Sequence, residues 1–220
     1  MKKVCLVIGA GAGIGGTVGR KFAEAGYHAA LCRRSDAEGL YSSVENIRRS
    51  GYSSSGHLLN VVDDGAIENL VLEAEAIGPL DTVLYNLGAQ IGTRSLAETP
   101  LKTFELGWKL ACFGLFRLAK AVIPLMIDRG HGTLLVTSAT AAVRGNAGQH
   151  SHAAAMAGRR LLCQTLNAEY AAQGIHVVHL VIDGSVDAPD TLGKMLGPER
   201  FEVLKKTKGN QHDGLLLPEK

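Results

Sequence analysis

Residues 3–16 read Lys-Val-Cys-Leu-Val-Ile-Gly-Ala-Gly-Ala-Gly-Ile-Gly-Gly, and this stretch decides the predicted fold. The apolar run Val4–Ile8 has the length and composition of a strand that is buried on both faces. Glycines follow at alternate positions, and Thr17–Ala25 is then predicted to form a helix that ends at Gly26. A second strand over Ala29–Cys32 completes a βαβ unit.

A glycine-rich turn between a strand and a helix is suited to binding an anion. Positions without side chains let a phosphate approach the backbone, and the helix N-terminus offers unpaired N–H groups and the positive end of its dipole. A tight turn without a ligand is the alternative. Because the strand and the helix are both present, the pattern favours a unit that binds half of a dinucleotide.

Composition excludes several classes of protein. The chain has 220 residues, 46% of them hydrophobic, and a formal net charge of +2. This length suits one domain with a sizeable core, with two small domains as the alternative. Near-neutral charge without basic runs argues against a nucleic-acid surface. The cysteines stand singly inside apolar stretches, which favours buried reduced thiols over zinc or disulfides (Cys5, Cys32, Cys112 and Cys163).

The N-terminus superficially resembles a secretory signal because Met1-Lys-Lys precedes apolar residues. The apolar run is short and breaks into glycines, and a charged helix follows, so a signal peptide is rejected. No apolar run is expected to reach the length of a membrane span. The expected location is the cytoplasm.

Strands and helices alternate along the rest of the chain. This alternation predicts one α/β domain over residues 1–220, with a doubly wound parallel sheet and helices on both faces. Pro124 is expected to kink the longest helix near its end. After Arg34 the expected elements are a polar helix 35–50, a connector 53–56, strand 57–62, helix 65–77, strand 81–85, helix 100–126, strand 133–137, helix 149–172 and strand 175–182.

The glycine spacing narrows the class of fold. Gly9-x-x-x-Gly13-x-Gly15 has three residues between its first two glycines, where the commoner dinucleotide fingerprint has one. At a chain's N-terminus this spacing resembles the short-chain dehydrogenase/reductase family, and matches extend over residues 4–188. The resemblance implies a Rossmann-like fold, a nicotinamide cofactor and cofactor contacts at Gly9, Gly11, Gly13, Ile14 and Gly15.

The end of the second strand bears on which cofactor binds. In the family this point lies over the adenosine ribose, and enzymes that prefer NAD place a carboxylate there. This sequence has Arg33 and Arg34 instead, whose guanidinium groups suit a 2′-phosphate, so NADP(H) is favoured over NAD(H). Two solvated surface arginines are the alternative. Asn60 and Val61 stand where the family has Asp-Val, and an Asn carbonyl oxygen can accept from the adenine amino group. A turn residue at the end of a strand is the alternative for Asn60.

Two more strand ends match the family's cofactor pattern in part. Asn86 and Gly88 keep their places in a segment that resembles the family's Asn-Asn-Ala-Gly. Gly184 and Val186 match its Pro-Gly-x-Val, which holds the nicotinamide carboxamide. Asp183 replaces the proline of that motif.

The family's catalytic positions do not match. The resemblance implies an asparagine, a serine, a tyrosine and a lysine, and their places fall on Ala111, Ala139, His152 and Met156. A shift of one residue would supply Ser138 in the serine's place. His152 is the candidate replacement for the tyrosine, because histidine titrates near neutral pH. His150, Ser151 and Ser138 lie near it in the alignment. Exposed residues at a helix N-terminus are the alternative for His150 and His152.

Two functions therefore stay open. The first is a binding or regulatory protein that keeps NADP(H) and has lost or impaired catalysis. The second is an oxidoreductase that transfers a hydride between NADP(H) and an unknown carbonyl or alcohol, using His152 or orientation alone. The family also implies a homo-oligomer, a homodimer or homotetramer formed through helices 100–126 and 149–172, where alanines and Gly158 permit close helix approach. No metal, nucleic acid or membrane partner is expected.

The C-terminal part is expected to shape the substrate site. In the family this is the segment after the sixth strand, here residues 187–210, whose glycines and lysine cluster suggest a lid. Such proteins usually have one further strand, which the sequence shown lacks unless residues 215–218 begin it.

Overall fold

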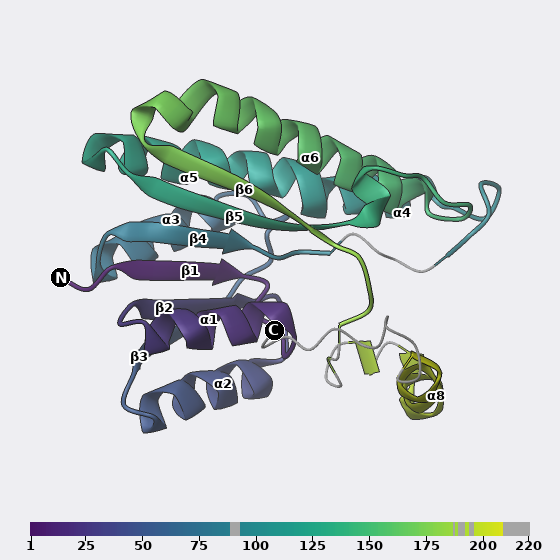
Figure 1. Cartoon of the computed structure of the whole chain (residues 1–220), viewed down its shortest axis with the longest axis horizontal. Helices are drawn as coiled ribbons and strands as arrows, with labels where there is room; N and C mark the ends of the chain where they lie inside the picture. The colour runs from purple at the N-terminus through teal and green to yellow at the C-terminus, as the bar shows by residue number, and fades with distance from the viewer. Residues whose placement is uncertain (89–92, 187, 189–191, 194–195, 209–220) are drawn as a thin grey trace.

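The computed structural model describes residues 1–88, 93–186, 188, 192–193 and 196–208. Six strands form one sheet in the order β3-β2-β1-β4-β5-β6, and every neighbouring pair is parallel. Figure 1 shows the strands running across the molecule, and the predicted doubly wound α/β sheet is confirmed. The strands are β1 (Val4–Ile8), β2 (His28–Arg33), β3 (Ser53–Leu58), β4 (Leu80–Tyr85), β5 (Gly132–Ala139) and β6 (Ile175–Ile182).

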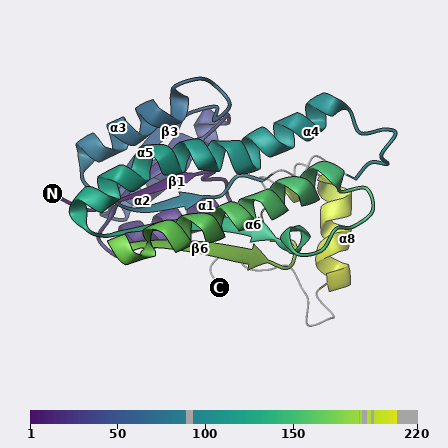
Figure 2. The ribbon, with the colours of Figure 1, turned by 90° about the horizontal axis from the view of Figure 1, so that it is seen from above.

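Helices cover both faces of this sheet (Figures 1 and 2). One face carries α1 and α2, which contact β1, β2 and β3, and the other carries α3, α5 and α6. The helices are α1 (Ile14–Glu24), α2 (Ala37–Arg49), α3 (Ala66–Ile77), α4 (Leu101–Trp108), α5 (Gly114–Arg129), α6 (His150–Tyr170) and α8 (Pro198–Lys208). A π-helical turn η1 (Lys109–Phe113) joins α4 to α5, and short 3₁₀ turns are η2 (Thr140–Ala142) and η3 (Ala171–Gln173).

The apolar core forms two layers, one on each side of the sheet. Val4, Leu6 and Ile8 point into the larger layer with α3, α5 and α6, while Cys5 and Val7 point into the smaller layer with α1 and α2. Every residue of β1 and β4 is buried. Burial on both faces explains why Val4–Ile8 reads as a continuous apolar run rather than an alternating one.

The third strand lies earlier in the chain than predicted. Residues 53–56 were expected to form a connector, but β3 begins at Ser53 and ends at Leu58. Its serines have partners within the sheet and α2: Ser53 Oγ lies 2.8 Å from His28 Nδ1, and Ser54 Oγ donates to the carbonyl of Val44 at 3.1 Å. Polar side chains that are satisfied in this way let a strand form without the apolar pattern that signals one.

The predicted helix 100–126 is divided. The departure from α-helical geometry lies at η1, and α5 continues through Pro124 to Arg129. By length and composition Leu101–Arg129 is apolar enough to cross a membrane, so the expectation that no stretch reaches that length was wrong. Part of this apolar character belongs to the core, because Leu115, Val122 and Met126 are fully buried against the sheet.

A histidine packed between β2 and β3 predicts a pH-dependent stability. His28 is 9% exposed, and its ring nitrogens lie 2.8 Å from Ser53 Oγ and 2.9 Å from Ser55 Oγ. Burial first, and then the charges of His57 and Arg48, lower the pKa of His28. The folded state therefore resists protonation at a pH where the unfolded chain accepts it. Stability is expected to fall as the pH drops below about 6.5, the ordinary value for histidine.

Urea unfolding of the parent and of His28→Gln at pH 7.5 and pH 5.5 tests this prediction. The parent should lose more stability between the two pH values than His28→Gln does. His176→Gln, a change at an exposed position on β6, is the control and should lose as much as the parent. An equal loss in all three proteins would contradict the role given to His28.

Candidate functional site

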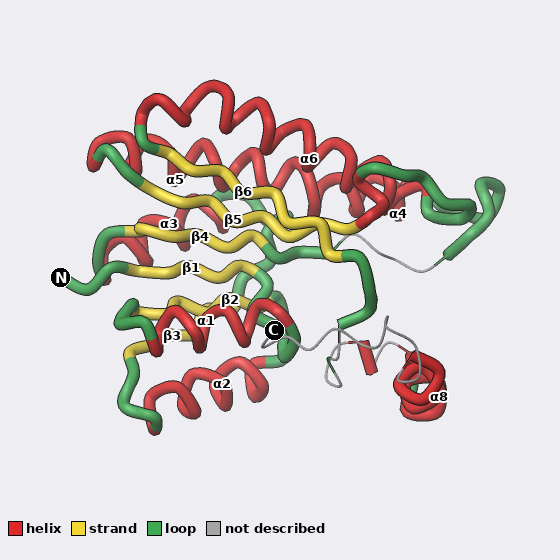
Figure 3. The backbone as a smooth tube through the Cα atoms, in the orientation of Figure 1, coloured by secondary structure: helices red, strands yellow, loops and turns green. Residues whose placement is uncertain are grey.

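The candidate site lies at the carboxyl ends of β1, β4 and β5, where the strands lead into loops (Figure 3). The strand order reverses between β1 and β4, and crevices at such a point bind ligands in open α/β sheets. Asn86 follows β4 and ties the two strands together. Its backbone N–H donates to the carbonyl of Ile8 at 2.8 Å, and its Nδ2 donates to the carbonyl of Gly9 at 2.9 Å.

The glycines of the turn after β1 are needed first for packing. Gly9 has φ +94°, and a Cβ there would lie 2.6 Å from the carbonyl oxygen of Asn86. A Cβ at Gly15 would lie 2.1 Å from the carbonyl oxygen of Gly9. Side chains at these positions would force the turn away from β4, so part of the glycine signal comes from close backbone approach.

The same turn opens onto a cavity of about 510 Å³. It is lined by Gly11, Gly13, Ile14 and Gly15, and α1 begins here without a side-chain cap. The first N–H groups of an α-helix have no partner within the helix, and its dipole favours negative charge. This uncapped end beside a cavity therefore fits a phosphate group.

A second cavity, of about 300 Å³, continues from the first along the ends of β2 and β3. Asn60 and Val61 line it together with Arg33 and Arg34. The Nδ2 of Asn60 donates to Asp63 Oδ1 at 2.8 Å, so its Oδ1 faces the opposite way and can accept. Val61 is buried and supplies an apolar wall. This cavity suits a flat aromatic group that carries an amino donor.

The two arginines at the end of β2 have different environments, and nothing in the sequence pattern distinguishes them. Arg33 is held by the fold: its Nε donates to the carbonyl of Ala10 at 2.6 Å, and its Nη1 lies 2.7 Å from Asp36 Oδ2. Arg34 is exposed and lines both cavities. Arg33 therefore already has acceptors within the chain, and its part in holding an anion stays a prediction.

Asp36 also places a carboxylate near the end of β2, beside the two arginines. Its backbone adopts φ +65°, in the left-handed region, and its side chain accepts from the N–H of Gly39 at the start of α2. Its carboxylate is neutralised by Arg33 and is 46% exposed. Arg34 is consequently the guanidinium available to an anion at this edge.

A third cavity, of about 350 Å³, lies on the other side of Gly88. Asn86, Gly88, Gly184 and Val186 line it, and each of them also lines the cavity at the glycine-rich turn. A Cβ at Gly88 would meet no atom of the described residues within 4 Å. The cofactor positions expected from sequence thus lie along connected cavities at one edge of the sheet.

The structure brings the expected catalytic positions together. Ser138, Ala139, His152 and Met156 line the third cavity. Ala111, in η1, is fully buried in a small apolar cluster with Met156. The hydroxyl of Ser138 donates to the sulfur of Met156 at 3.6 Å, which is a weak hydrogen bond.

His152 is buried, contrary to the alternative that it is an exposed residue at a helix end. It is 9% exposed, and its Nδ1 has no hydrogen-bond partner among the residues that the structure describes. Burial, and then the charge of Arg159, lower the pKa of His152. The neighbouring Ser151 points elsewhere, since its hydroxyl donates to backbone carbonyls of α4 at 3.2 and 3.3 Å. His152 and Ser138 are therefore the polar candidates from the sequence that face this cavity.

Arg159 also lines this cavity, although it is not among the site residues expected from the sequence. It is 1% exposed, and its guanidinium donates to the carbonyls of Ala111 at 2.9 Å, Thr137 at 2.7 Å and Leu87 at 2.7 Å. Its Cζ lies 5.3 Å from the centroid of the Tyr85 ring. The sequence does contain a signal for a buried charge. Position 159 lies on the same helix face as positions 152 and 156, and its arginine interrupts the apolar pattern of that face.

Comparisons with known proteins agree with this fold. The sequence model of a family described as short chain dehydrogenase matches residues 3–192. The chain is 30% identical over 211 residues to glycine betaine reductase ATRR of Emericella nidulans. The aligned region covers 95% of this chain and 16% of that protein. It is 29% identical over 194 residues to the 3-oxoacyl-(acyl-carrier-protein) reductase FabG of Escherichia coli, covering 86% of this chain and 75% of that protein.

A solved structure has the same fold. It is a 3-oxoacyl (acyl-carrier-protein) reductase from Agrobacterium tumefaciens C58 with NADP bound, and it matches 99% of this chain and 83% of its own with a TM-score of 0.85. The two sequences are 21% identical, so the likeness concerns the fold.

Proposed function

Because the chain belongs to the short-chain dehydrogenase family, we propose that it binds NADP(H) in the connected cavities and that its capacity for hydride transfer is impaired. The observation that carries the second part is the lining of the third cavity. The positions expected for serine, tyrosine and lysine hold Ala139, His152 and Met156. These positions therefore supply no hydroxyl or ammonium group to the third cavity. The protein would act as a binding or regulatory member of an oxidoreductase family.

The residues along the cavities fit the proposed cofactor. The uncapped start of α1 would hold the phosphates, while Asn60 and Val61 would hold the adenine. Arg34 would contact a 2′-phosphate, which supports NADP(H) over NAD(H). Gly88, Gly184 and Val186 would line the nicotinamide end. When bound, the reduced cofactor supplies a hydride.

A second candidate, an oxidoreductase that uses His152, has a specific observation in its favour. His152 and Ser138 line the same cavity, and the buried Nδ1 of His152 has no partner in the part of the chain that the structure describes. Ser138 could hold a carbonyl oxygen and His152 could give it a proton. The lowered pKa of His152 keeps its ring neutral at pH 7, which weakens it as an acid.

Fluorescence titration of the parent with NADPH and with NADH tests the binding part of the proposal. NADPH is expected to saturate one site per chain and to bind more tightly than NADH. His152→Ala separates the two candidates. If NADPH oxidation with a panel of carbonyl compounds disappears in this variant while NADPH still binds, His152 supports catalysis. Failure of both nucleotides to bind the parent would contradict the proposal.

We also expect a homo-oligomer that assembles through α4, α5 and α6. Large side chains on α4, η1 and α5 are exposed: Phe104 at 42%, Trp108 at 43%, Phe113 at 40% and Phe116 at 44%. A cavity of about 620 Å³ lies between α5 and α6, lined by Phe116, Ile123, Leu162 and Tyr170 among others. Ala155, one of the small residues of α6, is fully buried within its own chain. It therefore packs in the core and is not available to the proposed interface.

Sedimentation velocity of the parent and of Phe116→Glu tests this expectation. The parent should sediment as a dimer or tetramer, and Phe116→Glu as a smaller species, because a carboxylate would have to be desolvated in the interface. Leu72→Glu, at a position on α3 that is 64% exposed, should keep the parent's state. A monomeric parent at micromolar concentration would contradict the prediction.

Two expectations from the sequence remain predictions. The first is that residues 1–220 form one domain, which a single cooperative unfolding transition would support. The second is a cytoplasmic location, which fractionation of cells would test. The expected lid over residues 187–210 lies partly outside the described residues, and residues 215–218 lie wholly outside them.

A further inference from the structure

The cavity beside His152 has a buried positive charge beneath it. Arg159 is 1% exposed; burial lowers the pKa of its guanidinium, but an arginine side chain still stays charged at neutral pH. In the described part of the chain no carboxylate forms an ion pair with it, and its three hydrogen bonds go to backbone carbonyls. Carbonyl oxygens stabilise the cation through their dipoles but leave its net charge in place.

The acceptors of Arg159 come from the segments that build the cavity. Leu87 follows β4, Ala111 lies in η1, and Thr137 lies near the end of β5. Leu87, Thr137 and Arg159 all line the cavity. The guanidinium is therefore fixed at its wall by bonds to three separate segments, and a guanidinium has more N–H donors than these three bonds use.

The rest of the lining adds polar groups and no negative charge. Within the described ranges, His152 Nδ1 is buried without a partner, and the one acceptor of the Ser138 hydroxyl is the sulfur of Met156. None of the described residues that line the cavity is Asp or Glu. Asp183, next to the lining residues Ile182 and Gly184, is exposed and accepts from the hydroxyl of Thr140.

From this arrangement we propose that the cavity lined by Ser138, His152, Met156 and Arg159 binds a small oxo acid through its carboxylate. The proposal rests on the proposed function in so far as it assigns a ligand class to the nicotinamide end of the same site. The buried guanidinium attracts negative charge through low-dielectric surroundings, where such attraction is much stronger than in water. The polar atoms of His152 and Ser138 can bind the oxygen atoms of the acid.

The charge requirement separates an acid from its ester. A methyl ester keeps the carbon skeleton and the ketone of the acid but has no negative charge. If Arg159 attracts the ligand, an oxo acid should bind at least about tenfold more tightly than its methyl ester, because only the acid offers the guanidinium a negatively charged partner. A cavity that recognises its ligand by shape alone would bind the acid and the ester with similar affinity.

Isothermal titration calorimetry on the full chain tests this inference. The probes are pyruvate, 2-oxobutyrate, acetoacetate and 2-oxoglutarate, each beside its methyl ester, with and without saturating NADP⁺. At least one acid is expected to bind tenfold more tightly than its ester, and Arg159→Gln should remove most of that difference. Arg160→Gln, a change at the neighbouring and partly exposed arginine, is the matched control and should keep it.

The comparison of acid and ester uses the parent alone, so it holds even if Arg159→Gln fails to fold. Equal affinities for every acid and ester pair would overturn the inference, and so would displacement of the acid by an equal concentration of chloride. Failure of NADP⁺ to bind while an acid still binds in its absence would overturn the proposed function and leave this inference standing.

Discussion

A variant that carries Ala139→Ser, His152→Tyr and Met156→Lys is expected to oxidise NADPH with a generic diketone about 10²–10⁴-fold faster than the parent, the range typical of general acid catalysis. Positions 152 and 156 are four residues apart on α6, so their side chains lie on one helix face. Both positions and Ala139 line the same cavity. The lysine is needed because a tyrosine with its ordinary pKa of about 10 is a poor acid at neutral pH.

Arg159 makes this restoration harder than the sequence suggests. A lysine at position 156 would bring an ammonium group to the buried helix face that already carries the guanidinium, and two like charges there oppose each other. We therefore expect the triple variant to melt at a lower temperature than the parent, with part of the loss recovered when NADPH binds.

Single variants serve as controls for the restoration. His152→Tyr alone should add little activity, and it would remove any activity that His152 supports. A triple variant that folds and binds NADPH normally, yet is no more active than the parent, would contradict the assignment of positions 139, 152 and 156. Cofactor binding and thermal melting are measured beside NADPH oxidation for each protein.

Replacing Arg34 by alanine is expected to weaken NADPH binding about 10–100-fold and to leave NADH binding nearly unchanged. The magnitude follows from losing a charged hydrogen-bond partner of a phosphate, worth about 1.5–3 kcal/mol. NADH has no 2′-phosphate, so its affinity does not depend on this contact. Titration of the parent and Arg34→Ala with both nucleotides gives the result directly.

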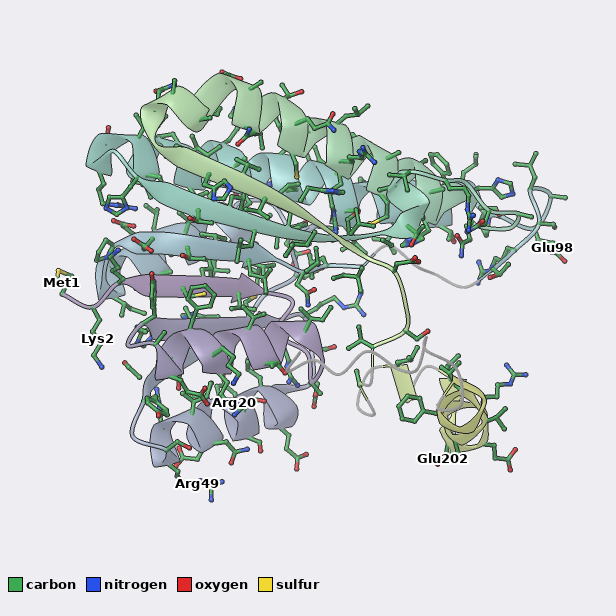
Figure 4. The ribbon with its side chains drawn as sticks, viewed as in Figure 1. Met1, Lys2, Arg20, Arg49, Glu98 and Glu202 are labelled. Atoms are coloured by element: carbon green, nitrogen blue, oxygen red, sulfur yellow. The ribbon has the colours of Figure 1, made fainter. Side chains whose placement is uncertain are left out.

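Two other arginine variants control this experiment. Arg33→Ala should weaken both nucleotides and lower stability, because Arg33 holds the turn through the carbonyl of Ala10 and the carboxylate of Asp36. Arg49→Ala should change neither affinity, since Arg49 lies at the end of α2 and points into solvent (Figure 4). Equal losses for NADPH and NADH in Arg34→Ala would contradict its assignment to the 2′-phosphate.

The fold could be predicted because its signals are local. The apolar run Val4–Ile8 and its counterparts alternate with helical segments, and strands buried on both faces leave a continuous apolar signal. β3 was misplaced because its serines are satisfied by His28 and by α2, contacts that no local pattern encodes. The π-helical turn η1 inside an apolar helix has no signal in periodicity either.

The site could be predicted in outline because its residues follow strand ends at set spacings. The roles of individual side chains could not, because they depend on partners distant in the sequence. Arg33 and Arg34 look alike in the sequence, but one is bound to Ala10 and Asp36 and the other is exposed. Arg159 donates to residues that are 22 or more positions away in the sequence. Its burial therefore depends on the tertiary fold and cannot be read from the local sequence.

The central claim is that the chain binds NADP(H) but transfers hydride poorly because positions 139, 152 and 156 lack the expected groups. NADPH oxidation by the parent, with protein saturated by NADPH and a broad panel of aldehydes, ketones and oxo acids, tests it most directly. Saturable NADPH binding with turnover well below the usual enzyme range of about 1–10³ s⁻¹ is the predicted result. Turnover within that range for any substrate in the panel would contradict it.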